Sequence, residues 1–381
     1  MNLNHINVIA RYEVKLVKRS WLFRIFAILA LLFISAIMLG YQTGIVNRMD
    51  NLWPRIAVSS LMPFCNTYFY NIAQSVIVVF LAGSFLKRDK KLDTAEVIYV
   101  RPMSNADYIV GKTWGIVKVF ITLNIITLLF TAFLNILINK SPFDLFPYLF
   151  YLLTISVPSL LFVLGLSFTA MCILKNQAVT FIVMLGIIGT VFFYLTDTLY
   201  GVFDFFGVNI PAIFSDVTGH ADLRLFLLQR FSYLLAGIGL ISMTIALVKR
   251  LPHKPWKIAV VYTFSSLFLL AACLGGLLYI LHYNHQLDLR NQYIMTFDKY
   301  ADVPHVDLLV NDISVTPQGH RLAGKSTVKV ANNNAKPLDK IIFYLNPELT
   351  VTSVEMAGKN LPFRRDHQVI EVDQPIQQQE E

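Results

Sequence analysis

The tripeptide Gly111-Lys112-Thr113 has the residue types that end a phosphate-binding loop, in which backbone N–H groups and a lysine hold a nucleotide. Such a loop also requires a glycine five residues before Gly111, and that position holds Ala106. It further requires a preceding strand, whereas the residues around Ala106 are typical of a helix. We therefore assign no nucleotide site to this chain and expect no ATP hydrolysis by it.

Histidine and cysteine residues are the other candidates for chemistry. His282 and His285 have the spacing H-x-x-H, which we interpret as interfacial histidines, with a metal site as the alternative. No histidine is followed by glutamate, so the zinc-peptidase motif His-Glu-x-x-His is absent. Cys65, Cys172 and Cys273 lie far apart in or beside apolar stretches, as small hydrophobic residues do. The sequence thus indicates no catalytic, cofactor-binding or metal-binding residue, and we expect no enzyme.

A polar segment, residues 87–113, opens with the basic run KRDKK and separates two apolar stretches. After a short amphipathic piece, Pro102 disfavours helix at Arg101. Ser104 and Asp107 have the spacing of a capping box, which predicts that a new helix starts at Ser104. The pattern therefore predicts a helix, a break and a second helix at the membrane surface.

The second of these helices can continue through Gly111 and Lys112 into the next apolar stretch. A break followed by a firmly capped helix is an elbow that can pass a push from a soluble partner to a membrane span. Glu96 and Arg101 supply the exposed charge that such a partner would contact. The alternative is a solvated loop whose basic residues only set topology.

The N-terminal residues 1–20 predict an amphipathic helix. Arg11, Lys15 and Lys18 share one face at the spacing i, i+4, i+7. Glu13 lies on the opposite, apolar stripe and has no basic residue three or four positions away to pair with. The basic face favours binding to anionic lipid, and Glu13 favours contact with a partner subunit as the alternative. The apolar stripe is formed by Ile6, Ile9, Leu16 and Val17.

Composition places these elements in a membrane. The chain of 381 residues is 55% hydrophobic and only 15% charged, well below the charged fraction of soluble domains. Such a composition favours lipid over nucleic acid as a partner.

Seven apolar stretches are long enough to span a bilayer, near residues 21–41, 64–86, 114–138, 145–173, 177–199, 226–248 and 258–281. Gln74, Asn124, Asn135, Asn176 and Gln177 lie in or beside these spans and predict helix packing or, alternatively, a substrate path.

Basic residues predict the orientation of the spans. Sixteen Lys and Arg residues lie in the N-terminal segment and in the loops expected on the same side of the membrane. Five lie in the loops expected on the other side: Arg48, Arg55, Lys140, Arg224 and Arg230. The N-terminus is therefore expected in the cytoplasm, and seven crossings put the C-terminus outside.

Between the fifth and sixth spans, the aromatic and acidic loop that begins at Asp197 predicts a re-entrant or interfacial helix, with an ordinary folded loop as the alternative.

The C-terminal part has a soluble composition. Alternating apolar residues and turn signals over residues 286–375 predict a small extracytoplasmic antiparallel β module, and residues 376–381 predict a disordered tail or a truncation point. The fold class expected is an all-α polytopic membrane protein of about seven spans with this β module. Its domains are the helix 1–20, a six-span region 21–250 with the elbow 87–113, and a seventh span 251–285.

The segment AEVIYVRPMSNADYIVGK resembles the region after the second span of type-2 ABC exporter permeases. The resemblance covers roughly residues 1–250. It implies a bacterial inner-membrane permease subunit that dimerises with a second subunit, identical or not. It also implies separate ATPase subunits, which bind the ATP and dock on the N-terminal helix and on the elbow from Glu96 to Lys112. The seventh span and the β module depart from the family pattern.

The β module itself resembles the first strands of aminopeptidase N-like zinc peptidases, over the segments HRLAGKSTVKVAN and LDKIIFYLNPELTVTSVEMAGKNL. This resemblance implies a second possible function: a membrane anchor for a zinc peptidase whose catalytic part is not in this chain. A receptor-like protein whose outer sheet binds a ligand is a third.

Overall fold

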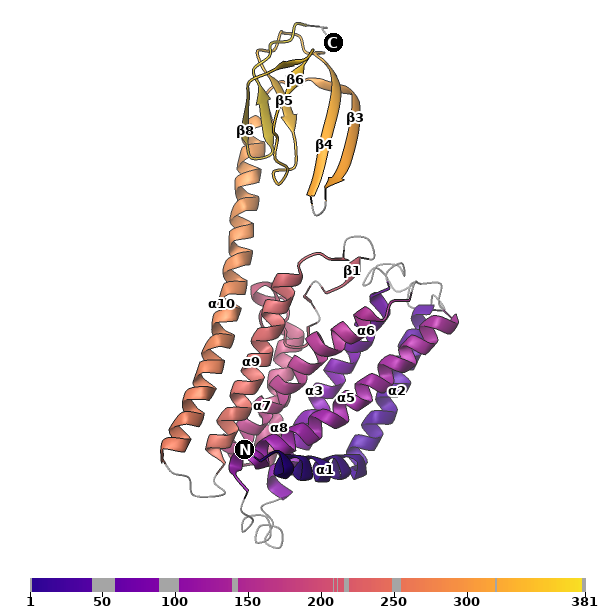
Figure 1. Cartoon of the computed structure of the whole chain (residues 1–381), viewed down its shortest axis with the longest axis vertical. Helices are drawn as coiled ribbons and strands as arrows, with labels where there is room; N and C mark the ends of the chain where they lie inside the picture. Colours follow the sequence, from indigo (N-terminus) through magenta and orange to yellow (C-terminus); the bar gives the residue numbers. More distant parts are fainter. Residues whose placement is uncertain are drawn as a thin grey trace. The chain divides into compact units, whose positions relative to one another are not determined.

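Figure 1 shows the computed structural model of the chain, coloured along its sequence. The structure describes residues 2–42, 59–88, 103–138, 143–207, 209–210, 212–215, 219–248, 255–318 and 321–378. Backbone contacts divide it into two compact units, Met1–Leu281 and His282–Glu381. Helix α10 (Pro255–Tyr300) belongs to both.

Unit 1 is a bundle of helices (Figure 1). Helix α1 (Leu3–Arg19) confirms the predicted amphipathic N-terminal helix, and an extended residue, Ser20, separates it from α2. The remaining helices are α2 (Trp21–Gln42), α3 (Leu61–Arg88), α5 (Asn105–Ile138), α6 (Phe146–Tyr151), η2 (Leu152–Ser156), α7 (Val157–Leu174), α8 (Gln177–Thr190), η3 (Val191–Leu195), η4 (Thr198–Gly201) and α9 (Leu223–Leu247).

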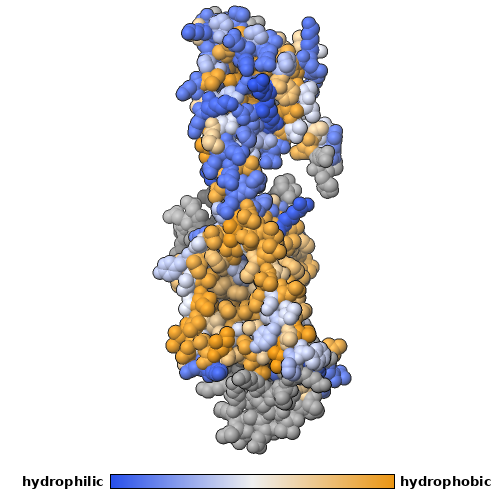
Figure 2. Space-filling model, turned by 90° about the vertical axis from the view of Figure 1, so that its left-hand side faces the viewer, coloured by the Kyte–Doolittle hydropathy of each residue, from blue (hydrophilic) through white to orange (hydrophobic). Residues whose placement is uncertain are grey.

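Six helices or helix runs in the described residues are long and apolar enough to cross a membrane. They begin at Leu61, Asn105, Phe146, Gln177, Leu223 and Pro255. Helices α1 and α2 meet at 71° and give a seventh candidate if they are counted as one bent span. This architecture fits a multi-pass, mostly helical membrane protein. Figure 2 shows the apolar surface of unit 1 in orange on the side where α10 lies.

Three exposed tryptophans lie where α2, α5 and α10 begin or shortly after. Trp21, Trp114 and Trp256 are 74%, 43% and 62% exposed. Lys118 Nζ lies 5.0 Å from the ring centre of Trp114, and Lys257 Nζ lies 5.8 Å from that of Trp256. Tryptophan beside lysine is typical of the membrane–water interface.

The segment between η3 and α9 differs from the sequence prediction. Its described residues contain the short 3₁₀ turn η4 and the two-residue strands β1 (Phe214–Ser215) and β2 (Gly219–His220), so the re-entrant or interfacial helix is wrong there. Four apolar residues of this segment are buried: Phe205, Phe206, Ile210 and Ala212. It is a folded loop that enters the bundle, which is closer to the alternative interpretation.

Unit 2 is built from antiparallel strands after the end of α10. Strands β3 (Asp307–Gln318) and β4 (Arg321–Ala331) form a long ribbon. Strands β5 (Ile341–Tyr344), β9 (Val369–Val372) and β8 (Phe363–Asp366) form a three-stranded sheet, and β6 (Glu355–Met356) pairs with β7 (Lys359–Asn360). The core contains Val306, Leu338, Ile341, Ile370, Val372 and Ile376.

Two boundaries differ from the sequence prediction. Helix α10 continues to Tyr300, so residues 286–300, expected in the β module, are helical. The predicted disordered tail is wrong at its start, because Ile376 is 6% exposed and its backbone pairs with that of Leu338. Asn332 Nδ2 also donates to the carbonyls of Ile376 at 3.3 Å and Gln377 at 3.2 Å, so this end is held to the strand layer.

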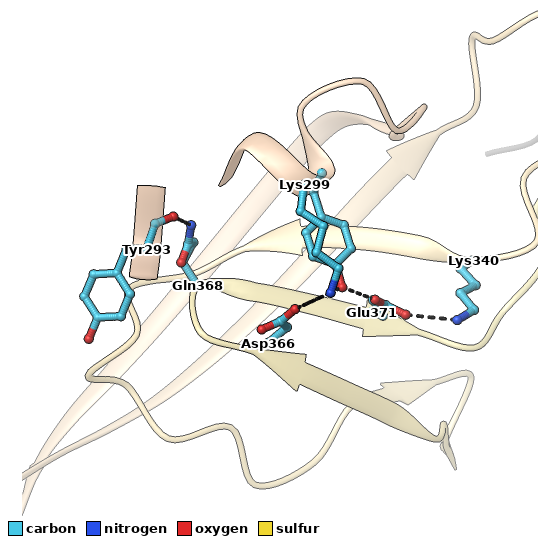
Figure 3. Close-up of polar contacts among 7 residues, drawn as sticks. Tyr293, Lys299, Lys340, Asp366, Gln368 and Glu371 are labelled. Carbon is cyan, nitrogen blue, oxygen red and sulfur yellow. Dashed lines mark hydrogen bonds and ion pairs between the residues drawn. The ribbon is translucent and has the colours of Figure 1, made fainter. Parts of the chain in front are cut away.

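Figure 3 shows how the end of α10 is fixed to the three-stranded sheet within unit 2. Lys299 Nζ donates to Asp366 Oδ2 at 2.7 Å, and the Tyr300 hydroxyl donates to Glu371. Lys340 Nζ donates to the other oxygen of Glu371 at 2.9 Å. The Lys299 bond lowers the pKa of Asp366, and the bonds from Tyr300 and Lys340 lower the pKa of Glu371. These hydrogen bonds hold the last turn of α10 to the sheet while both carboxylates are ionised.

Candidate functional site

The junction between α1 and α5 is the candidate site, and its first part is the predicted capping box. The Asp107 backbone N–H donates to Ser104 Oγ at 3.0 Å, and the Ser104 N–H donates to Asp107 Oδ2 at 3.1 Å. The prediction of a capped helix start is therefore confirmed. Asp107 Oδ1 also accepts the Asn2 backbone N–H at 2.8 Å. One carboxylate thus ties the start of α1 to the start of α5.

Two glycines on α5 let α1 approach closely. A Cβ atom at Gly111 would lie 2.8 Å from Ile9 Cβ, and one at Gly115 would lie 2.6 Å from Glu13 Cβ. A Cβ at Gly115 would also lie 2.9 Å from the Ala10 carbonyl oxygen. Glycines four residues apart form a groove in which a second helix backbone can lie. The residues G-K-T-W-G, whose first three resemble a nucleotide motif, are therefore a helix-packing motif.

A buried ion pair lies in this contact. Lys112 Nζ donates to Glu13 Oε1 at 2.9 Å, and each side chain is only 2% exposed. The Lys112 ammonium also lies 5.1 Å from the ring centre of Tyr108. Two opposite charges removed from water attract strongly, and each becomes costly if the other is removed. Lys112 of the same chain is therefore a partner of Glu13, which the sequence did not identify, and contact of α1 with another subunit stays a prediction.

The remaining predicted site residues divide into three groups. Arg11, Lys15 and Lys18 are exposed on the face of α1 that points away from α5. No ion pair involves them within the described part of the chain. Ser104, Asp107, Gly111 and Lys112 all lie in the junction, where they hold α1 instead of presenting charge. The other three, Glu96, Arg101 and Pro102, lie outside the described residues.

Sequence reasoning missed three residues of the junction. Ala10 is fully buried at the crossing point, and Gly115 completes the glycine pair. Asn105 Nδ2 donates to the Val248 carbonyl at 2.7 Å, which ties α5 to the end of α9. The Gly-x-x-x-Gly spacing of Gly111 and Gly115 is a signal that could have revealed the crossing. The Asn105 bond joins residues far apart in sequence and has no local signal.

A second buried charge lies near the opposite end of the bundle. Arg230, expected in an outer loop, is a residue of α9 and is 1% exposed. Its guanidinium donates to Gln229 Oε1 at 2.6 Å and to the carbonyls of Asp204 at 2.5 Å and Phe205 at 3.2 Å. A Cβ at Gly207 would lie 2.7 Å from this guanidinium, so the loop approaches it at a glycine. Arg230 therefore holds the buried loop and does not act as a surface topology signal.

The polar residues predicted inside the spans take several roles. Gln74 Nε2 donates to the Ser156 carbonyl of η2 at 3.5 Å, and Asn135 Nδ2 donates to the Tyr148 hydroxyl of α6 at 3.4 Å. Asn176 caps α8 by accepting the backbone N–H of Ala178 at 2.9 Å. These bonds join or cap helices, which favours the packing interpretation for Gln74, Asn135 and Asn176.

Removal of one partner of the buried ion pair should destabilise the junction. We expect Glu13→Leu or Lys112→Met alone to cost about 3–5 kcal/mol, because each leaves an uncompensated buried charge. The double variant Glu13→Leu/Lys112→Met should recover most of this loss. Thermal unfolding of purified protein in detergent measures it, with the exposed Lys15→Met as control. Additive losses in the double variant would show that the two charges do not interact.

The glycine groove predicts a second effect, which is steric. Gly115→Ala should cost about 1–3 kcal/mol, because the new methyl group must displace the α1 backbone. Gly189→Ala on α8 is the matched control: a Cβ there meets no atom within 4 Å, and alanine favours helix. The same unfolding assay compares them. Equal stability of the two variants would contradict the close α1–α5 contact.

The contacts of the junction fix a basic surface helix on the end of a candidate span. Comparison with known proteins adds no further guide, since no family model and no curated protein sequence matches the chain.

Proposed function

We propose that the chain is the permease subunit of an ATP-driven exporter of the ABC type, moved by a separate ATPase subunit that docks on α1. The buried Glu13–Lys112 pair is the observation that carries this proposal. It fixes α1, a helix with an exposed basic face, to the start of α5, a helix long and apolar enough to span the membrane. A force on α1 is then transmitted directly to α5, because the ion pair leaves no flexible hinge between the two helices.

Charge suggests which surface the ATPase contacts. Arg11, Lys15 and Lys18 are exposed together, so the docking face on the partner should be acidic. The excess of basic residues on the N-terminal side favours a cytoplasmic location for this face, where ATP is available. The chain would alternate between inward-open and outward-open states as the ATPase closes and opens. Glu96, Arg101 and Pro102 remain predicted parts of the same contact.

The experiment reverses this charge. The variant Arg11→Glu/Lys15→Glu/Lys18→Glu should lose co-purification of an ATPase at matched membrane levels, because facing acidic groups would repel it. Arg101→Glu should act in the same direction. The control is Lys325→Glu/Lys329→Glu in unit 2, two basic residues that are exposed on β4.

The rival interpretation of the basic face is contact with anionic lipid. In that case, the triple variant would recover as much ATPase as the unchanged chain, and only its binding to vesicles containing anionic lipid would fall. That result would contradict docking on α1.

A phosphatase fused after Glu381 tests the orientation separately, since it should be active only outside the cytoplasm.

One observation favours the second candidate, a membrane anchor for a peptidase. The β3–β4 register places Ile313, Val315, Leu322 and Val328 on one face of the ribbon, where they are 65%, 53%, 72% and 39% exposed. An apolar ribbon face of this kind is normally covered by further protein. Detection of the native protein with an antibody to unit 2 separates the two: a product much larger than 43.3 kDa favours the anchor.

A further inference from the structure

Helices α3, α5 and η2 carry polar side chains that are buried inside unit 1. Each of these side chains is at most 3% exposed. An uncharged polar side chain inside an apolar bundle usually bonds another helix or contacts a ligand. We call this set the polar layer, and it consists of Asn66, Thr67, Asn71, Gln74, Asn124, Thr127, Thr131 and Ser156.

Hydrogen bonds join the three helices at the layer. Thr131 Oγ1 donates to Asn66 Oδ1 at 3.3 Å, which joins α5 to α3. Gln74 Nε2 donates to the Ser156 carbonyl at 3.5 Å, which joins α3 to η2. The same Gln74 nitrogen donates to Asn71 Oδ1 at 2.5 Å within α3. Helix α3 is therefore bonded to both of its neighbours through the layer.

The third side of the layer lies between α5 and η2. Leu128 of α5 packs with Leu152 of η2 in one apolar cluster. Helix α5 and the run that contains η2 follow each other in the chain and point in opposite directions (Figure 1). Asn124 lies one turn before Leu128, and Ser156 lies one turn after Leu152, so both are displaced by about 6 Å in the same direction. Asn124 and Ser156 therefore reach the same depth in the bundle.

Several buried atoms of the layer have no hydrogen-bond partner within the described residues. They are Asn66 Nδ2, Thr67 Oγ1, Asn124 Oδ1 and Ser156 Oγ. A buried polar atom without a partner is costly, and proteins satisfy nearly all of them with protein groups or with bound molecules. Such atoms on three adjoining helices therefore mark a place where another molecule supplies the missing partners.

The backbone at the layer is also unusual. The run η2, whose last residue is Ser156, is a π-helix, and Pro158 just beyond it has no N–H to continue an α-helix. Single π turns within α-helices are frequent at functional sites. The backbone geometry of η2 thus supports the same location as the unpartnered atoms.

We propose that the polar layer binds a hydroxyl group between α3, α5 and η2, either that of water or that of an uncharged polar solute. The amide nitrogen of Asn66 needs an acceptor, and the amide oxygen of Asn124 needs a donor. A hydroxyl group is both at once, and it also suits the hydroxyls of Thr67 and Ser156. Every side chain of the layer is uncharged, so the layer offers no opposite charge to an ion that would leave water.

This inference deepens the proposed function and rests on it for the way in which the layer opens. The layer is closed in this structure, since its side chains are buried. The Glu13–Lys112 pair fixes α1 to α5, and α5 carries Asn124, Thr127 and Thr131. A force on α1 would therefore move one side of the layer relative to α3. The location of the layer itself is argued from burial and hydrogen bonds alone.

Modification of introduced cysteines tests the site on the purified full chain, without an ATPase. In a Cys65→Ala/Cys172→Ala/Cys273→Ala background, Ser156→Cys and Thr67→Cys each replace an unpartnered hydroxyl by a thiol of similar size. The uncharged, hydroxyl-bearing reagent hydroxyethyl methanethiosulfonate should modify both, as measured by the mass of the intact chain. The modification persists, so it accumulates over brief openings of the bundle. Circular dichroism confirms that each variant is folded.

Val78→Cys in the same background is the matched control. Val78 continues the face of α3 one turn beyond Gln74, is fully buried and lies in the apolar core. The hydroxyethyl reagent should react with Ser156→Cys and Thr67→Cys about tenfold faster than with Val78→Cys. Equal rates at the three positions would overturn the site.

Charged reagents test the preference for an uncharged ligand. The sulfonatoethyl and trimethylammonioethyl methanethiosulfonates carry a negative and a positive charge. Each rate is divided by the rate of the same reagent at Glu355→Cys, an exposed position in unit 2. At Ser156→Cys, this ratio should be about tenfold lower for both charged reagents than for the hydroxyethyl reagent. Equal ratios would refute an uncharged ligand.

Excess glycerol distinguishes the two sources of the hydroxyl group. A lower ratio for the hydroxyethyl reagent in glycerol identifies a solute site, and an unchanged ratio identifies water; both agree with the proposal. Loss of ATPase binding by the α1 variant, with normal modification of the layer, would refute only the proposed function. Normal ATPase binding without preferential modification of the layer would refute only the site.

Discussion

The ion pair between Glu13 and Lys112 is the interaction on which the N-terminal half of the bundle depends. Each charge is buried, and burial of either one alone is strongly unfavourable. The pair therefore specifies the position of α1 on α5 as well as stabilising it. The glycines at 111 and 115 make the approach possible, and the Asp107 carboxylate fixes the first residues of both helices. These contacts together hold α1 against the start of a candidate span.

The same cost of unpaired polar groups shapes the loop between α8 and α9. Backbone carbonyls that enter an apolar bundle need donors, and the guanidinium of Arg230 supplies two of its N–H groups to Asp204 and Phe205. Asn71 Nδ2 donates to the Phe206 carbonyl at 2.9 Å from the neighbouring helix α3. A buried irregular loop is stable here because side chains of the surrounding helices replace the hydrogen bonds that a helix would have made internally.

Helix α10 belongs to both units. Its first part is apolar, and its last turns are held to the sheet by Lys299 and Tyr300. At 1.5 Å per residue its 46 residues extend about 69 Å, more than twice the thickness of a hydrocarbon core.

Local patterns in the sequence determined several features by themselves. Hydrophobic length predicted long apolar helices, six of which are candidate spans in the described residues. The Ser104–Asp107 spacing predicted the start of α5, and the spacing of Arg11, Lys15 and Lys18 predicted the exposed face of α1. These features depend on residues within one or two helical turns, where spacing alone fixes geometry. Glu13 showed the limit, since its position on an apolar stripe signalled a missing partner without identifying it.

Only the tertiary structure decided the partners that lie far apart in the chain. Glu13 and Lys112 are separated by 99 positions, and Asn105 and Val248 by 143. Distant partners also explain two wrong predictions. Arg230 was expected in a surface loop, and Ile376 was expected in a disordered tail. In each case the neighbour that satisfies the buried group comes from another element. The packing of helices and strands decides which residue becomes that neighbour. The spacing of residues within one element contains no information about this packing.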